Sequence, residues 1–292
     1  MEPVEVQEEE LLAHFIKLRN EQVLNKNSVT VLKLTAPGIG RQYLHPVLWR
    51  VAGTFSLADS QAKRMLQCVT NTFPVQARLA KIKKAQHPKC LFCQHPYESL
   101  FHWQQQCPQF QEARTRVHHN IWSAVYSVIC KRVSTQYECY KEVSVGQTYL
   151  STEEGLRRMR PDSIFWNKTT CQWTLVDFTR SYGRTRADLV KAEETKQVHY
   201  QDLMVSLRQT HGSVKFYPLA TGYNGSVAKD TWRAFMQRLE LGDKAQVEVF
   251  HTLVQELCKG FSTMVDVRWG CMVEGRRRHS QGENQNKKLF DD

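Results

Sequence analysis

The segment CLFCQHPYESLFHWQQQC carries a full set of metal-ligand side chains: Cys90, Cys93, His102 and Cys107. Their spacing is C-x2-C-x8-H-x4-C. Three thiolates and one imidazole complete the tetrahedral coordination of a structural zinc ion and leave no position open for a substrate. The alternative is a set of unrelated core cysteines, since free cysteine is among the most buried residue types. His95 lies in the same loop, and spacing alone does not decide between it and His102.

The whole composition narrows the class of protein. Nine cysteines, an odd number, and an acidic start (MEPVEVQEEELLAHF) do not suit a secreted disulfide framework. No apolar run reaches the length of a membrane span. We therefore expect a reducing, intracellular location and no membrane partner.

The chain has 40 Lys and Arg against 29 Asp and Glu, a formal charge of +11. This excess favours a polyanionic partner such as nucleic acid, although a basic surface alone is weak support.

A basic segment directly precedes the cysteine cluster. In NTFPVQARLAKIKK the cations are Arg78, Lys81, Lys83 and Lys84. A charge run is usually a solvated face of a helix. Because this run borders a predicted metal knuckle, we expect these four side chains to bind nucleic acid.

Hydrophobic periodicity predicts an α/β chain, in which strands and helices follow the knuckle. Pro and Gly interrupt the pattern after an N-terminal helix at 6–24, and Pro74 interrupts a helix at 59–84. The later predicted helices are 110–133, 187–210, 228–241 and 244–261, and the predicted strands are 162–167, 172–179 and 213–223. The polar residues from 276 onward are expected to be a disordered tail.

Two aspartates in the predicted strand pair suggest a second metal site. If the hairpin turns between Thr169 and Thr170, Asp162 lies directly opposite Asp177. Directly opposed residues have Cβ atoms about 4.5–5.5 Å apart, so two carboxylates there repel each other unless a cation lies between them. A hard cation such as Mg²⁺ suits oxygen ligands. The alternative is that both are ordinary strand-end residues and the turn is centred elsewhere.

The helix after this hairpin carries an unusual lysine. Lys196 is seven residues from both Leu189 and Leu203, which puts it in the middle of the apolar stripe, whereas Lys191 is on another face. A core-facing lysine is costly unless it is paired or functional. The alternative is a lysine whose aliphatic stem is covered while its amine stays in water. Two acids with a metal and one lysine suit phosphodiester hydrolysis, in which the lysine orients the water or stabilises charge on the phosphate.

These motifs, taken in order, resemble those of a known family. They are the basic segment, the CCHC knuckle, RTRVHHN, RPD with a second Asp after fourteen intervening residues, KQVHY, and VKFYPLATGYNGSVAKDTW. The chain resembles, over about residues 60 to 240, the C-terminal part of polyproteins from site-specific non-LTR retrotransposons. Those polyproteins carry a zinc knuckle followed by a restriction-like endonuclease of the PD-(D/E)xK class, a mixed sheet flanked by helices.

The resemblance implies roles for individual residues. The knuckle ligands match Cys90, Cys93, His102 and Cys107, the acids that bind Mg²⁺ or Mn²⁺ match Asp162 and Asp177, and the catalytic lysine displaced onto a helix matches Lys196. His119 and Asn120 fall where the family has a histidine-containing motif, and we assign them no role. The sequence also departs from the family pattern, because position 179 is Thr rather than the lysine of a strict D-x-K. His199, rather than a second lysine, precedes Tyr200.

The resemblance also implies a domain plan and a function. We expect an N-terminal segment (1–58), a basic helical linker (59–86), the zinc knuckle (87–112), the endonuclease domain (113–275) and a basic disordered tail (276–292). The implied function is metal-dependent nicking of duplex DNA in the nucleus, with element RNA as a second nucleic-acid partner. The reverse transcriptase that precedes these motifs in the family is not in this sequence, which leaves open a fragment, a decayed copy or a domesticated protein; a reverse transcriptase on another chain is an expected partner. The alternatives are a non-catalytic or domesticated nucleic-acid-binding remnant and a zinc-stabilised protein-interaction module.

Overall fold

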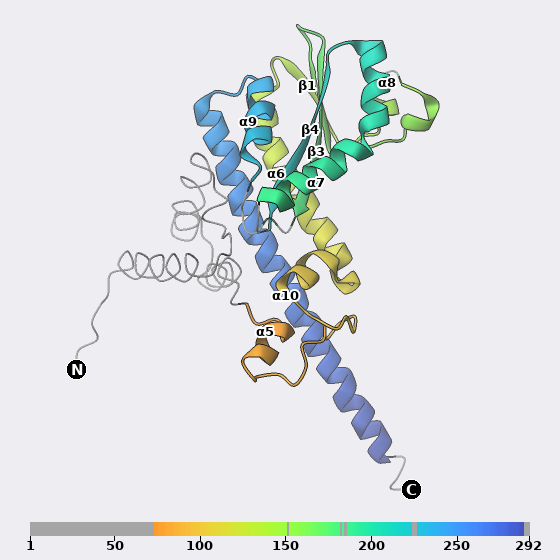
Figure 1. Ribbon diagram of the computed structural model, residues 1–292, viewed down its shortest axis with the longest axis vertical. Coiled ribbons are helices and arrows are strands. Elements are labelled where there is room, and N and C mark those ends of the chain that lie inside the picture. The colour runs from red at the N-terminus through yellow and green to blue at the C-terminus, as the bar shows by residue number, and fades with distance from the viewer. Residues whose placement is uncertain (1–72, 151, 182, 184–185, 224–226, 289–292) are drawn as a thin grey trace, which may run out of the picture.

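The computed structural model describes residues 73–150, 152–181, 183, 186–223 and 227–288 (Figure 1). The helix predicted at 6–24, the segment 1–58 and the first part of the basic linker lie outside these residues. The described part is a mixed α/β structure, as predicted. None of its helices is long and apolar enough to cross a membrane.

The core element is a four-stranded sheet in the order β1-β2-β3-β4. The strands are β1 Tyr137–Lys141, β2 Ser163–Asn167, β3 Gln172–Ser181 and β4 Val214–Gly222. The first three strands pair antiparallel, and β3 pairs with β4 in parallel. A parallel pair needs a crossover connection, which the helices between β3 and β4 provide. Strand β1 was not predicted from the sequence.

The β2–β3 hairpin has the register that would place the two aspartates opposite each other, and not the alternative of a turn centred elsewhere. Ser163 lies opposite Val176, which centres the turn between Thr169 and Thr170. The side-chain oxygen of Asn167 accepts hydrogen bonds from the backbone N–H groups of Thr169 (3.0 Å) and Thr170 (2.9 Å). An asparagine that bonds to the backbone two residues ahead stabilises a tight turn. This turn therefore fixes which residues of β2 and β3 face each other.

Helices cover both faces of the sheet. They are α6 Gln111–Val133, α7 Arg186–His199, α8 Gln201–His211, α9 Lys229–Arg238 and α10 Asp243–Lys288. In Figure 1, α6, α9 and α10 lie to one side of the sheet and α8 lies to the other. The alternating residues of the strands accordingly enter two cores. Phe165 and Phe178 pack with α6 and α10, whereas Ile164 and Leu175 pack with α8.

Two helix predictions need correction. The helix predicted over 187–210 is two helices, α7 and α8, which meet at Tyr200. The segment 276–292, predicted to be a disordered tail, continues α10 as far as Lys288. The long α10 runs beside α6 in Figure 1 and approaches it closely. A Cβ atom added at Gly260 would lie 2.5 Å from Cγ1 of Val117, so this contact requires glycine.

The knuckle segment packs on α10 through one buried ion pair. Arg268 of α10 donates to the Glu98 carboxylate at 3.0 and 3.2 Å, and both side chains are buried. The guanidinium also lies over the rings of Phe73, Phe92 and Trp103, with distances to the ring centroids of 5.6 to 5.9 Å. The basic linker contributes one short helix here, α5 Gln76–Lys81. These contacts place the knuckle and the basic segment against the same long helix.

Candidate metal centre and acidic site

The four predicted ligands of the knuckle come together in the structure. The ligand atoms of Cys90, Cys93, His102 and Cys107 all lie within 4.8 Å of one another. The Sγ atoms of Cys90 and Cys107 are 3.9 Å apart, and Sγ of Cys93 is 3.2 Å from Nε2 of His102. Ligands at about 2.0–2.3 Å from a tetrahedral ion are separated by roughly 3.3–3.8 Å. This cluster could therefore hold a metal ion such as zinc.

The geometry also decides between the two histidines of the loop. His102 directs Nε2 at Cys93, whereas the ring of His95 stacks on the outside of the His102 ring with a centroid distance of 4.2 Å. Nδ1 of His95 lies near the backbone of Tyr97. His102 is therefore the fourth member of the cluster.

Local hydrogen bonds bring these side chains together. The backbone N–H of Cys90 donates to the carbonyl of His95 at 2.8 Å, which closes the turn between the first two cysteines. The N–H of Cys107 donates to the carbonyl of His102 at 2.7 Å, at the end of the short helical turn His102–Gln106. Burial raises the pKa of the Cys107 thiol to about 12 and lowers the pKa of His102. Neutral imidazole is the form that binds a metal, and the thiols must release protons when they do.

The two predicted acids face each other across the hairpin. Since Ser163 lies opposite Val176, Asp162 falls opposite Asp177 by the same register. Oδ2 of Asp162 accepts a hydrogen bond from the backbone N–H of Phe178 at 2.6 Å. Burial raises the pKa of Asp177, and the nearby charge of Asp162 raises it further. These are the electrostatic conditions that a bound cation relieves.

Lys196 reaches this pair from α7, although the stripe predicted through Leu203 is divided between α7 and α8. Its Nζ atom is 2.8 Å from Oδ1 of Asp177. The Lys196 side chain is 32% exposed and that of Asp177 is 6% exposed, so the amine is within reach of solvent while its partner is buried. Lys191, on the other face of α7, is exposed. The structure thus joins Asp162, Asp177 and Lys196 in one site.

Sequence reasoning missed two side chains around these acids. Nε2 of His118, on α6, is 3.3 Å from Oδ1 of Asp162. The hydroxyl of Tyr200, the residue directly after α7, lies against Asp177. The spacing of Lys196 and Tyr200 by four residues is a helix-face signal that could have identified Tyr200. His118 had no such signal.

The remaining predicted residues lie apart from the acids. His119 pairs with Glu142, with 2.8 Å between Nδ1 and Oε1, and Asn120 is exposed on α6. The four predicted nucleic-acid-binding cations, Arg78, Lys81, Lys83 and Lys84, are all exposed in or just after α5. They lie at the end of the molecule that carries the Cys/His cluster, which we call the knuckle end.

Comparisons with known proteins give no family for this chain. No family model matches the sequence, and no curated protein matches it either. The retrotransposon resemblance therefore stays a prediction from the motifs.

Proposed function

We propose that this chain is a divalent-metal-dependent endonuclease that nicks duplex DNA. The observation that carries the proposal is the juxtaposition of Asp162, Asp177 and Lys196. Two carboxylates opposed across a hairpin, one of them buried, form an oxygen donor set that fits a hard cation. A lysine 2.8 Å from one carboxylate adds a positive charge where a phosphate would approach. The motif order described above supports DNA as the substrate and the nucleus as the location.

The proposed roles follow from where each side chain lies. Asp162 and Asp177 would hold a Mg²⁺ or Mn²⁺ ion, which, when bound, polarises a phosphate and lowers the pKa of a bound water. The backbone N–H of Phe178 fixes the orientation of the Asp162 carboxylate. Lys196, whose amine is part-exposed, would orient the attacking water or stabilise negative charge on the phosphate oxygens. Zinc in the Cys/His cluster would have a structural role, because that ligand set is complete.

One observation favours a second candidate, a nucleic-acid-binding protein without catalysis. The direct contact between Lys196 and Asp177 already neutralises the buried carboxylate without a metal ion. A decayed enzyme could keep this ion pair for stability, because breaking a buried pair is costly.

Nicking of supercoiled plasmid separates the two candidates. Wild type should nick with Mg²⁺ or Mn²⁺ and stop with excess EDTA, whereas Asp177→Ala should lose nicking and keep its DNA affinity. Lys196→Ala should lower the rate by about 10²–10³-fold, the scale for one preorganised electrostatic group. Lys191→Ala is the matched control on the same helix and should retain activity. The endonuclease proposal is wrong if wild type binds DNA but leaves plasmid, mixed-sequence DNA and a genomic target uncut with either ion. The second candidate, a nucleic-acid-binding protein without catalysis, would then take its place.

A further inference from the structure

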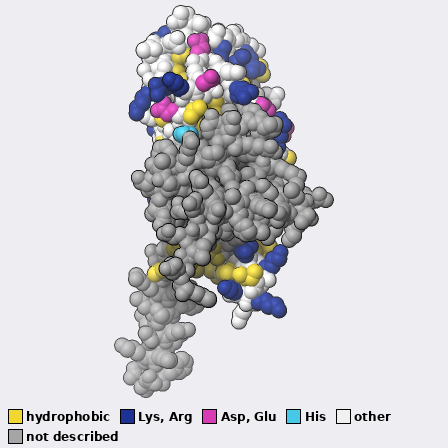
Figure 2. Space-filling view, turned by 90° about the vertical axis from the view of Figure 1, so that its left-hand side faces the viewer, with side chains coloured by type: hydrophobic (Ala, Val, Ile, Leu, Met, Phe, Trp, Pro, Cys, Tyr) yellow, Lys and Arg dark blue, Asp and Glu magenta, His cyan; other side chains and the backbone are white. Residues whose placement is uncertain are grey.

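The knuckle end of the molecule combines exposed cations with exposed apolar side chains. Residues 73–97 contain no Asp or Glu. The cations of this stretch, Arg78, Lys81, Lys83, Lys84 and Lys89, are all exposed. Ile82, Leu91 and Tyr97 are 47, 54 and 55% exposed, respectively. We call this set of eight side chains the knuckle face. In the lower part of Figure 2, Lys and Arg side chains flank hydrophobic ones.

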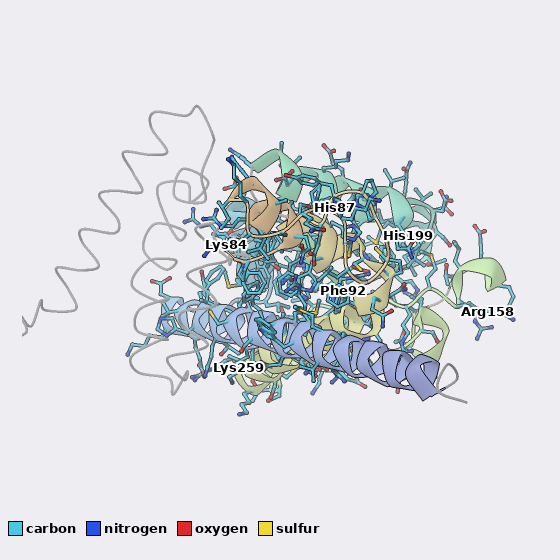
Figure 3. The ribbon with its side chains drawn as sticks, turned by 90° about the horizontal axis from the view of Figure 1, so that it is seen from below. Lys84, His87, Phe92, Arg158, His199 and Lys259 are labelled. Atoms are coloured by element: carbon cyan, nitrogen blue, oxygen red, sulfur yellow. The ribbon has the colours of Figure 1, made fainter. Side chains whose placement is uncertain are left out.

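Backbone hydrogen bonds hold the knuckle face together at Glu98. Its carbonyl accepts from the N–H of Ala77 at 3.2 Å, and its own N–H donates to the carbonyl of Pro88 at 2.7 Å. The start of α5 and both sides of the knuckle turn therefore meet at one residue. The Glu98 carboxylate is buried and neutralised by Arg268, so it does not offset the positive charge of the knuckle face. Figure 3 shows Lys84 toward the outside of this end of the molecule and Phe92 near the middle, above α10.

The backbone of Tyr97 lies across the turn from that of Lys89. The N–H of Glu98 donates to the carbonyl of Pro88, and the N–H of Cys90 donates to the carbonyl of His95, so Lys89 and Tyr97 each lie between two cross-turn bonds. Both side chains are exposed. An aromatic side chain and a lysine from neighbouring backbone positions can bind a base and its phosphate together.

We propose that the knuckle face binds single-stranded nucleic acid, with an unpaired base stacked on Tyr97 and the phosphates on the surrounding lysines. This inference rests on the proposed function and specifies the nucleic acid that the knuckle end would hold. Cations alone would serve a duplex equally well, because both forms carry phosphates. A duplex, however, hides the faces of its bases, so the three exposed apolar side chains among the cations can stack on base faces only where the bases are unpaired.

Fluorescence anisotropy on the full chain tests this inference. The probes are labelled 15-nucleotide oligo-dT and oligo-U and a 15-base-pair duplex, without added Mg²⁺ or Mn²⁺ so that no cleavage interferes. We expect wild type to bind at least one single strand more tightly than the duplex. Tyr97→Ala should weaken single-strand binding by about 5- to 150-fold, the measured range for loss of one base–aromatic stack. Tyr97→Trp should retain it. The DNA and RNA probes show which strand the knuckle face prefers.

The controls separate stacking from charge. Tyr149→Ala removes a tyrosine that is 72% exposed but lies in a loop of the sheet region, and it should leave binding unchanged. Lys89→Ala should flatten the slope of log affinity against log salt by up to about 0.7, whereas Tyr97→Ala should lower affinity at every salt concentration without changing the slope. Metal content should stay the same in both variants. Equal affinity for duplex and both single strands, or wild-type binding by Tyr97→Ala, would overturn the inference. Plasmid nicking is measured separately, so a failure here is distinguishable from a failure of the endonuclease proposal.

Discussion

The buried ion pair between Glu98 and Arg268 should be the main attachment of the knuckle to the rest of the molecule. We consider Arg268→Met, which keeps much of the side-chain length and removes the charge. The variant leaves the Glu98 carboxylate buried, and among the described residues its remaining hydrogen-bond donor is the backbone N–H of Gln76 at 2.9 Å. It also removes the guanidinium from the rings of Phe73, Phe92 and Trp103.

The magnitude follows from burial. The two side chains are 2% and 0% exposed, so water cannot replace the lost partner. Removing one member of a buried pair costs about 3–5 kcal/mol, because an uncompensated charge stays in the interior. For a folded unit of this size, each kcal/mol lowers the melting temperature by about 2–4 °C. The melting temperature of Arg268→Met should therefore fall by roughly 10 °C.

Differential scanning calorimetry and hydrogen exchange measure the effect together. Amides of residues 73–107 should lose protection in Arg268→Met more than those of the sheet, since this segment depends on the pair. The double variant Glu98→Gln with Arg268→Met should recover part of the stability, because no charge is left buried. Arg132→Met is the control: its pair with Glu248 is 53% and 43% exposed, and such pairs contribute at most about 1 kcal/mol. Equal melting temperatures for Arg268→Met and Arg132→Met would refute the argument.

Three further predictions concern metal, salt and pH. Metal analysis of purified protein should find about one zinc ion per chain, and Cys93→Ser should lose it and unfold residues 87–112; folded wild type without zinc would contradict this. DNA affinity should fall steeply with salt, and Arg78→Ala and Lys81→Ala should each flatten the slope by up to about 0.9; an affinity that does not depend on salt would count against it. Burial raises the pKa of the Glu193 carboxyl from 4.5 to about 7. Between these two pH values the folded state keeps a proton that the unfolded state has released, so the free energy of unfolding falls as the pH rises from 4.5 to about 7. In urea titrations, the free energy of unfolding of Glu193→Gln should therefore rise relative to that of wild type between pH 5 and about 7. A difference between the two proteins that does not change with pH would contradict the raised pKa of Glu193.

The parts of the site that depend on short-range spacing could be predicted from the sequence. The sequence allowed a hairpin centred between Thr169 and Thr170, beside the alternative of a turn centred elsewhere, and the structure has the register that puts Asp162 opposite Asp177. The helical repeat placed Lys196 on the inner face of α7. The four knuckle ligands lie within one loop, so their spacing already limited how they could meet. In each case a few bonds or one helical turn fixes the geometry.

The parts of the structure that depend on long-range packing could not be predicted from the sequence. Glu98 and Arg268 are 170 residues apart in sequence, and neither has a local signal that names the other. Strand β1 has no clear alternation and is defined by its pairing with β2. His118 meets Asp162 only because α6 packs against the end of the hairpin. Such contacts depend on the arrangement of whole elements, which local periodicity does not specify.

Under the proposed endonuclease function, Lys196 would take the role of the lysine that a strict D-x-K motif places at position 179, where this sequence has Thr. In the register of β3 and β4, Thr179 lies opposite Ala220, two residues beyond Asp177. The Glu193 carboxylate of α7 bonds to the backbone of Ala220, and it accepts a hydrogen bond from Thr231 at 3.0 Å. These bonds hold α7 against β4. Lys196, three residues further along α7, has its amine 2.8 Å from Oδ1 of Asp177. In the proposed enzyme, α7 would therefore supply to Asp177 the cation that a D-x-K strand would carry at position 179.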